Sequence, residues 1–373
     1  MGRSWLDAYP PGVPAEIDPD EHQSLVAMLE KSFERFANQP AFQNLGKQLT
    51  FAEVDSLSRD FAAYLQSLPG LSPGDRVAVM MPNLLQYPVA VIGALRAGLV
   101  VVNVNPLYTP RELEHQLTDS GAKLLLVIEN FASTAAEVVD RTGIEQVVIT
   151  RIGDHLPPLK RVVTNFVVKY VKRMVPGWRI DGAIGYLDAL ALGAGREFEP
   201  VAIQLAEPAF LQYTGGTTGV AKGAVLTHRN MVANLLQVGA WAQPIIEGPG
   251  DLIVTPLPLY HIFSLTVNMF SFIELGANNL LITNPRDIPG FVKEIQNARF
   301  SFMTGVNTLF VALLQDPRFA DVDFSKLKAA MGGGMAVQRA VSDDWQAVTG
   351  RPIIQGYGLT ETSPVICGNP LTA

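Results

Sequence analysis

The sequence predicts an α/β fold made of two parallel-sheet α/β subdomains packed together. Short continuous apolar runs alternate with helical stretches between residues 53 and 150, and the same alternation returns after about residue 205. Such runs are typical of parallel strands covered on both faces, and their alternation with helices indicates parallel sheets. We expect residues 1–205 to form the first subdomain and residues 206–373 the second.

The elements of the first half follow from local patterns. Val54, Leu57, Phe61 and Leu65 recur at spacings of three and four, which predicts a helix over 53–68. Thr109 and Pro110 begin a second clear helix, over 110–120. The remaining expectations are strands at 76–81, 99–104, 123–128 and 146–150, and helices ending at 97 and spanning 131–141. In the second half we expect strands at 209–213, 252–255, 279–283, 328–331 and 352–355.

Composition excludes several classes of protein. The 373 residues are 48% hydrophobic and 17% charged, which indicates a folded chain with a large core. Acidic residues outnumber basic ones 35 to 28, so no global positive field attracts nucleic acid, and we expect no nucleic-acid partner. A single cysteine, Cys367, excludes an internal disulfide and a multi-thiolate metal site, and fits a reducing compartment.

The sequence contains neither a signal-peptide pattern nor a membrane-spanning pattern. Residues 1–14 are polar and broken by proline, unlike a signal peptide. The most apolar stretch, 89–104, carries Arg96 and falls short of the roughly 18 apolar residues of a spanning helix. We therefore expect a cytoplasmic protein.

Residues 155–180 differ in kind from both halves, and we interpret them as an insertion or bridge. They contain no acid and five basic residues before Pro176, namely Lys160, Arg161, Lys169, Lys172 and Arg173. Apolar residues lie at helical spacing between them: Val163, Phe166, Val167, Tyr170, Val171 and Met174. A basic amphipathic helix can rest on an anionic membrane, which would give peripheral contact with the inner face of the cell membrane through 160–175. The alternative is a helix that packs its apolar stripe on its own domain.

Residues 213–223, Tyr-Thr-Gly-Gly-Thr-Thr-Gly-Val-Ala-Lys-Gly, have the composition of a phosphate-binding loop and join a predicted strand to a predicted helix. Glycines let backbone N–H groups approach phosphate oxygens, hydroxyls donate further hydrogen bonds, and Lys222 adds a positive charge. The spacing is not that of a Walker A loop, because Gly223 follows the lysine where Ser or Thr is needed. The alternative is a Gly/Thr-rich surface turn.

With a second motif, Gly356-Tyr-Gly-Leu-Thr-Glu361, the chain resembles the acyl-adenylate-forming superfamily of acyl-CoA synthetases, luciferases and peptide-synthetase adenylation domains. The first signature of that family matches residues 214–223, except that Ala221 stands where proline is usual. The resemblance extends over residues 256–261, the glycines 332–334 and most of the chain from about residue 41. In detail, residues 213–230 and the basic insertion look most like bacterial long-chain fatty-acid CoA ligases.

The resemblance implies ATP and coenzyme A as cosubstrates, Mg²⁺ as cofactor and a fatty acid as substrate. The carboxylate attacks the α-phosphorus of ATP, so the site must neutralise phosphate charge and align two anions. By resemblance, Thr360 contacts the α-phosphate, Glu361 holds Mg²⁺, and Tyr357 stacks on adenine. The β- and γ-phosphates would be enclosed by Thr214, Gly215, Gly216, Thr217, Thr218, Gly219 and Lys222. Adenine and the acyl group would be flanked by Gly332, Gly333, Gly334, Gln355, Gly356 and Gly358.

His261 follows Leu257-Pro-Leu-Tyr260 and stands among apolar residues. By resemblance it lines the acyl site, with a role in orientation and not in base catalysis. The alternative is a hydrogen-bonded structural histidine. With Thr214, Lys222, Thr360 and Glu361 it completes the candidate catalytic set.

The family also uses a ribose-binding aspartate, a hinge residue and a lysine on a small C-terminal domain, all of which would lie beyond residue 373. We expect the chain by itself to bind ligands better than it turns them over. Family members are often dimers, so the resemblance implies a homodimer, although no dimer face is recognisable. Two alternatives to a long-chain ligase stay open: a medium-chain or aryl carboxylate CoA ligase, and a non-catalytic nucleotide-binding module.

Overall fold

The computed structural model describes residues 4–214 and 220–370, which fold into two compact units. Unit 1 combines Met1–Gln43 with Arg229–Ala373, and unit 2 is Asn44–His228. The expected boundary at residue 205 is therefore wrong. Strand β8 (Pro208–Thr214) pairs with β4 (Val100–Asn103) in the sheet of unit 2, and the first 43 residues belong with the C-terminal half.

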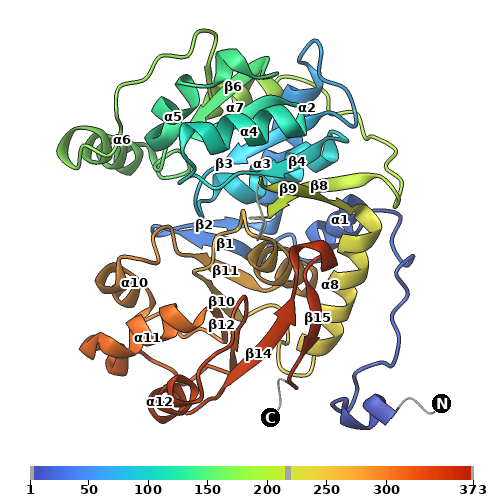
Figure 1. Cartoon of the computed structure of the whole chain (residues 1–373), viewed down its shortest axis with the longest axis vertical. Helices are drawn as coiled ribbons and strands as arrows, with labels where there is room; N and C mark the ends of the chain where they lie inside the picture. Colours follow the sequence, from blue (N-terminus) through green and yellow to red (C-terminus); the bar gives the residue numbers. More distant parts are fainter. Residues whose placement is uncertain (1–3, 215–219, 371–373) are drawn as a thin grey trace. The chain divides into compact units, whose positions relative to one another are not determined.

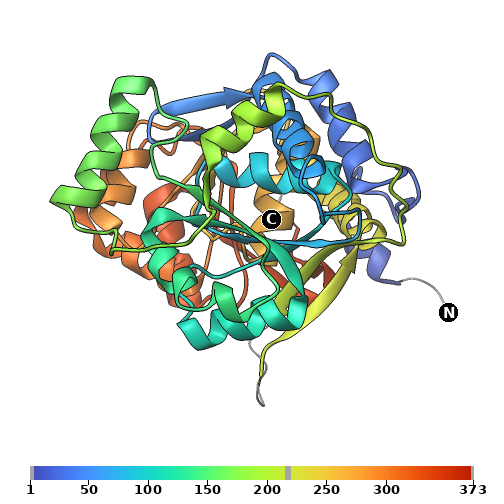
Figure 2. The same cartoon turned by 90° about the horizontal axis from the view of Figure 1, so that it is seen from above.

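Unit 2 is built on a sheet with the strand order β7-β6-β5-β3-β4-β8-β9. Every pair is parallel except β8 with β9, which form an antiparallel hairpin. The further strands are β3 (Arg76–Met80), β5 (Ala122–Ile128), β6 (Gln146–Thr150), β7 (Ile184–Gly185) and β9 (Lys222–Thr227). Helices cover this sheet, as Figures 1 and 2 show, which confirms the predicted α/β class.

The helices of unit 2 follow the predicted pattern closely where their capping signals are strong. Helix α4 (Pro110–Ser120) has the predicted bounds, because Thr109 caps its N-terminus in a reciprocal capping box with Glu112. Residues 131–141 do not form one continuous helix; they are divided among η2 (Glu129–Phe131), α5 (Ala132–Ala136) and η3 (Val139–Arg141). The other elements are β2 (Lys47–Thr50), α2 (Phe51–Gln66), α3 (Gln86–Arg96), α6 (Pro158–Phe166), the π-helix η4 (Val167–Val171) and α7 (Tyr186–Ala194).

Unit 1 contains seven strands of a second, eight-stranded sheet, in the order β15-β14-β13-β12-β10-β11-β1. The pairs among these seven strands are parallel except β14 with β15. The strands are β1 (Pro40–Asn44), β10 (Leu252–Thr255), β11 (Asn278–Leu281), β12 (Phe302–Gly305), β13 (Ala329–Gly332), β14 (Ile353–Gly358) and β15 (Val365–Gly368). The sequence patterns did not predict β12. This strand has only four residues, and two of them, Thr304 and Gly305, interrupt the apolar pattern.

Two apolar layers cover this sheet. On one face Trp345 is fully buried and stacks edge-on against Phe310, with ring centroids 4.9 Å apart. That face is covered by α10 (Ile288–Ile295), α11 (Asn307–Gln315) and α12 (Arg339–Thr349), which lie together in Figure 1. The opposite face packs against α8 (His228–Ala242), η5 (Ser264–Phe270, a π-helix) and α9 (Ser271–Leu275). Unit 1 also holds η1 (Ser4–Ala8), α1 (Leu25–Arg35), η6 (Pro317–Asp321) and η7 (Thr360–Thr362).

Within the described residues, no helix combines the length and the apolar composition that a bilayer crossing needs.

Candidate functional site

Thr214 and Lys222 bracket the Gly/Thr-rich loop as cross-strand partners, because Thr214 ends β8 and Lys222 begins β9. The prediction that this loop leads into a helix is therefore wrong; it joins two antiparallel strands, and α8 begins only at His228. No helix N-terminus contributes its dipole at Lys222. Gly215, Gly216, Thr217, Thr218 and Gly219 lie outside the described residues.

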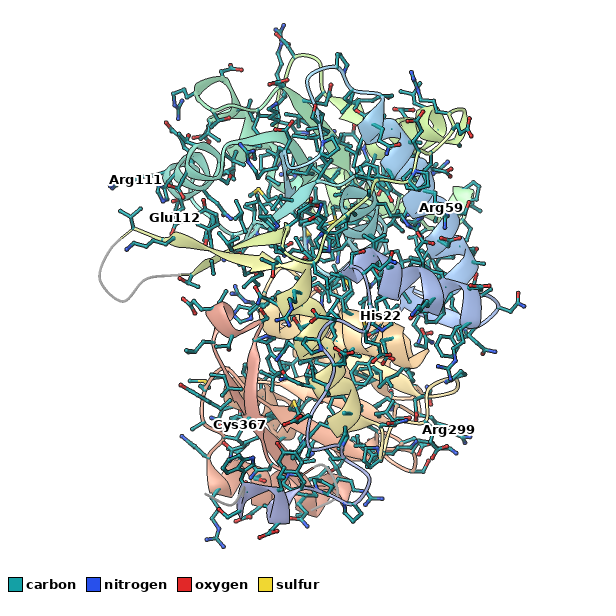
Figure 3. The ribbon with its side chains drawn as sticks, turned by 90° about the vertical axis from the view of Figure 1, so that its right-hand side faces the viewer. His22, Arg59, Arg111, Glu112, Arg299 and Cys367 are labelled. Atoms are coloured by element: carbon teal, nitrogen blue, oxygen red, sulfur yellow. The ribbon has the colours of Figure 1, made fainter. Side chains whose placement is uncertain are left out.

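Helix α4 supports the loop end of this hairpin, in the region where Figure 3 labels Glu112. The His115 Nε2 atom lies 3.0 Å from the carbonyl oxygen of Ala221, and the Tyr213 hydroxyl donates to Asp119 Oδ2 at 2.5 Å. Burial, reinforced by the Asp119 carboxylate, raises the pKa of Tyr213 and keeps its hydroxyl protonated. A side chain at Gly223 would come within 3.0 Å of the Tyr213 ring. Sequence reasoning missed these supports, because they join residues about 100 positions apart.

The second motif lies at the carboxyl end of β14, where ligand sites of parallel α/β sheets are usually found. Tyr357 is 59% exposed, so one ring face is free to stack on a planar group. Thr360 begins the short helix η7, and the Glu361 side chain is exposed. A Cβ on Gly358 would collide with the carbonyl oxygen of Pro364, so this position needs glycine.

The glycine turn after β13 lies beside this motif in unit 1. A Cβ on Gly333 would lie 2.9 Å from the Phe263 ring and 3.4 Å from the Gly356 carbonyl oxygen. Gly334 has a φ of 75°, a left-handed conformation that favours glycine. Gln355 is oriented by the Val337 N–H, which donates to its Oε1 at 3.1 Å. The pairing of Gly332 with Gln355 and the approach of Gly333 to Gly356 thus place the glycine turn beside the second motif.

His261 follows β10 and precedes the π-helix η5. Its Nδ1 accepts a hydrogen bond from the Phe263 N–H at 3.3 Å, so the neutral ring carries its proton on Nε2. The side chain keeps accessible surface although many protein atoms surround it, and desolvation lowers its pKa below the ordinary value. This geometry suits a neutral hydrogen-bond donor, and Phe263 links it to Gly333.

A buried polar network behind His261 was not predicted. Thr304 donates to Asn268 Oδ1 at 2.9 Å, and Asn268 Nδ2 donates to Thr255 at 3.3 Å. Thr255 in turn donates to Asn279 Oδ1 at 2.9 Å. These side chains tie η5 to the ends of β10, β11 and β12 and fix the segment that carries His261 and Phe263. Isolated Asn and Thr residues give no signal of such a network in the sequence.

An apolar cavity of about 420 Å³ lies against the α8 face of the unit 1 sheet. Met331 and Gly356, at the carboxyl ends of β13 and β14, line it beside the second motif. Phe302, the first residue of β12, and Phe272 also line it. The last turn of α8 and an N-terminal segment, residues 5–17, contribute further wall. The size lies in the range of about 300–1,000 Å³ typical of small-molecule sites.

The donors suited to a divalent cation are few. No group of three or more His, Cys, Asp or Glu side chains among residues 4–214 and 220–370 could enclose a metal ion. The exposed Glu361 carboxylate suits a hard cation that takes its other ligands from phosphate and water.

The candidate site residues thus form two sets. Thr214 and Lys222 lie in unit 2, while His261, the glycine turn and residues 355–361 lie in unit 1.

Comparison with known proteins identifies the family of this arrangement. The family model described as AMP-binding enzyme matches residues 29–373. The chain is 56% identical over 370 residues to a long-chain-fatty-acid–CoA ligase of Escherichia coli, covering 99% of this chain and 66% of that protein. It is 51% identical over 373 residues to the corresponding ligase of Haemophilus influenzae, again 66% of that protein's length.

The fold also matches a solved structure, the crystal structure of a long-chain-fatty-acid-CoA ligase from Archaeoglobus fulgidus. The TM-score is 0.79 at 23% identity, and the match covers 97% of this chain and 69% of that one. At this identity the likeness shows the fold alone.

Proposed function

Because this chain belongs to the AMP-binding enzyme family, we propose that it carries the nucleotide and acyl sites of a long-chain fatty-acid CoA ligase. A fatty-acid carboxylate oxygen attacks the α-phosphorus of ATP, pyrophosphate leaves, and acyl-AMP forms. The sulfur of coenzyme A then attacks the acyl carbonyl, and AMP leaves. The chain spans 66% of the length of its curated relatives, and the proposal concerns the residues within it.

Residues of both signature motifs bind phosphate groups of ATP. Thr214, Lys222 and the loop 215–219 enclose the β- and γ-phosphates; the cross-strand placement of Thr214 and Lys222 supports this role, because both hold positions at the base of that loop. Thr360 donates to the α-phosphate at the end of β14. The protein thereby supplies charge neutralisation and alignment, which are the main needs of this reaction.

The adenine lies between Tyr357 and the glycine turn. The exposed side chain of Tyr357 offers a stacking surface for the flat base. Gln355 lies next to the exocyclic edge. The neutral His261 donates through Nε2 and orients the acyl carboxylate, without acting as a base.

Glu361 binds Mg²⁺, which neutralises phosphate charge when it is present. The exposed carboxylate on the short helix η7 supports this assignment. Glu361→Ala should abolish ligase activity while leaving the melting temperature unchanged. A substitution without effect on any activity would favour the non-catalytic nucleotide-binding module.

One observation carries the choice of substrate: the apolar cavity opens beside the second motif within the same unit. Burial of an aliphatic chain contributes about 0.8 kcal/mol per methylene, so such a cavity favours long acyl groups over short ones. We propose calorimetric titration of the purified chain with non-hydrolysable acyl-adenylate analogues carrying hexadecanoyl, butanoyl and benzoyl groups, with AMP as the control. The hexadecanoyl analogue should bind most tightly. A benzoyl or medium-chain optimum would favour the alternative ligase, and equal binding to AMP would contradict an acyl site.

A second part of the proposal is peripheral contact of α6 and η4 with an anionic membrane. A fatty-acid substrate favours this contact, because fatty acids partition into membranes. Only Val167 and Val168 are half-buried, and most apolar residues of this segment are exposed: Leu159 (79%), Val162 (64%), Val163 (53%), Phe166 (56%), Tyr170 (63%), Val171 (65%) and Met174 (49%). None of these side chains is buried, although Phe166 and Tyr170 border a cavity of unit 2 that Trp178 also lines, so the alternative in which the stripe is buried against its own domain is not supported. Figures 1 and 2 show α6 at the outer edge of unit 2.

Polar residues of the same segment contact the rest of unit 2. Lys160 Nζ donates to the Leu45 carbonyl oxygen, the Asn165 side chain accepts from the Gly153 N–H at 2.9 Å, and Lys169 pairs with Glu129 at 2.8 Å. A helix on a water-facing surface normally has the opposite orientation. The outward apolar stripe together with Lys172 and Arg173 matches an interfacial helix on anionic lipid.

Vesicle flotation tests this contact. The chain should float with vesicles containing phosphatidylglycerol, less with pure phosphatidylcholine, and less at high salt. Phe166→Ser with Tyr170→Ser should reduce binding about tenfold or more, because two aromatic side chains lose their burial. Leu192→Ser, at a 49% exposed position of α7, is the matched control. Equal binding by all three proteins would contradict the assignment.

A further inference from the structure

The N-terminal segment, residues 5–17, forms a wall of the apolar cavity although it lies more than 200 residues from α8 in the sequence. Its side chains on the cavity include Trp5, Tyr9, Val13 and Ile17. Figures 1 and 3 place the N-terminal helix η1 beside the end of unit 1 where β15 ends. The segment thus lies away from the carboxyl ends of β13 and β14.

The contact between Tyr9 and Trp241 holds this wall in place. The two rings meet edge to face, with centroids 5.2 Å apart and planes at 89°, a favourable aromatic geometry. Trp241 is itself fixed, because its Nε1–H donates to the Asn369 carbonyl oxygen at 3.0 Å. Farther along the chain, the Asp20 carboxylate pairs with Arg229 on α8 through contacts of 2.7 and 3.1 Å. Both anchors attach the N-terminal region to α8.

The cavity therefore has two unlike ends. Met331 and Gly356 line the end beside the second motif, where an acyl carbonyl would react. Phe302 begins β12 and pairs with Ala329, which precedes Met331 by two residues, so the cavity extends toward the amino ends of the strands. An aliphatic chain that starts at the motif and follows the cavity would meet the aromatic pair Tyr9–Trp241 and the segment behind it.

We propose that the N-terminal segment is the far wall of the acyl site and that the Tyr9–Trp241 pair limits the length of the acyl chain. This inference rests on the proposed function, since it assigns the cavity to the acyl group. Each methylene that fits into the cavity in front of this wall raises the affinity of the acyl ligand about fourfold. Further methylenes, which the wall excludes, add no affinity. A segment distant in sequence thereby becomes a specificity determinant for a site built by the sheet.

Calorimetry with saturated acyl-adenylate analogues of 6 to about 20 carbons tests this. For the unchanged chain, affinity should rise with length and then level off. Tyr9→Ala and Trp241→Ala should move the plateau to longer chains, and Ala8→Leu, which adds volume to the cavity wall, should move it to shorter ones. Leu6→Ala is the matched control, because Leu6 belongs to η1 but does not line the cavity.

The outcomes separate the inference from the function on which it rests. Binding of long-chain analogues with the same plateau in all four variants would overturn the role of the wall and leave the ligase proposal intact. Failure of the unchanged chain to bind any acyl analogue more tightly than AMP would overturn the ligase proposal itself. Melting curves for each variant exclude a change in folding as the cause of a shift, and opposite shifts in Ala8→Leu and Tyr9→Ala cannot arise from general destabilisation.

Discussion

Lys222 lies directly across the β8–β9 hairpin from Thr214, so the only lysine of the first signature holds a fixed position in a sheet. Its side chain is exposed, and no helix dipole adds to its charge. The positive charge at this position therefore comes from the lysine itself, and the hairpin fixes the point from which that side chain extends.

Replacement of this lysine should weaken nucleotide binding without destabilising the chain. Lys222→Ala should raise the dissociation constant for ATP about tenfold to a hundredfold, the usual effect of losing a charged hydrogen bond. Lys222→Arg should retain part of the affinity. Titration calorimetry measures both, and Lys326→Ala, which removes an exposed lysine of unit 1, serves as control. Unchanged ATP affinity in Lys222→Ala would remove this residue from the phosphate site.

Gly358 should tolerate no side chain. Its Cβ would collide with the Pro364 carbonyl oxygen, a backbone atom that cannot rotate away, so Gly358→Ala must displace either β14 or the turn after η7. We expect a lower melting temperature and a loss of nucleotide affinity together. Gly177→Ala is the matched control, since a Cβ there meets nothing within 4 Å. A Gly358→Ala protein that binds ATP normally would contradict the close approach.

Among the ion pairs of unit 2, the pair of buried Arg96 with partly exposed Asp55 should contribute most to stability. Arg96 interrupts the most apolar stretch of the sequence, and its side chain is fully buried, donating to Asp55 Oδ1 at 2.5 Å and to the Asp55 carbonyl oxygen at 2.7 Å. Asp55→Ala leaves a buried guanidinium without its carboxylate and should cost about 3 kcal/mol.

Urea denaturation of Asp55→Ala against Asp181→Ala tests this expectation. Asp181 pairs with Arg179 at 3.0 Å, but both side chains are more than 80% exposed, so its removal should cost less than about 1 kcal/mol. Similar losses in the two variants would show that the Arg96 charge finds other compensation.

His155 should make stability fall as the solution becomes acidic. Its Nε2 lies 3.1 Å from the Tyr186 hydroxyl, and burial, followed by the charge of Lys47, lowers its pKa from 6.5 to about 4. Between these values the unfolded chain binds a proton that the folded chain does not, so stability is full above pH 6.5 and is lost as the pH falls toward 4. The loss is about 3 kcal/mol at roughly 1.4 kcal/mol per pKa unit.

The measurement is the free energy of unfolding between pH 4 and 7 for the unchanged chain and for His155→Gln. The variant should be less stable at pH 7 but should show a shallower slope, because carboxylates titrate equally in both proteins. Parallel curves would mean that His155 is protonated in the folded state at an ordinary pKa.

Most of the site chemistry could be predicted from the sequence because it lies in short contiguous motifs. Residues 356–361 carry a tyrosine, a threonine and a glutamate within six positions, and their spacing identifies the family before any fold is known. Local signals likewise fixed α4, whose cap involves only Thr109, Pro110 and Glu112. Such features depend only on residues that are close together in the chain, so they can be predicted from the sequence.

The tertiary structure alone decided which distant segments meet. Pairing of β8 with β4 moved the unit boundary from residue 205 to residue 228, and pairing of β9 with β8 replaced a predicted helix by a strand. The outward face of α6, the Asn268 network and the contact of Tyr9 with Trp241 depend on the same kind of pairing. The physical reason is common to all: the chemistry of a side chain limits the kind of group it contacts favourably, but only the folded chain determines which residue outside its own local segment supplies that contact.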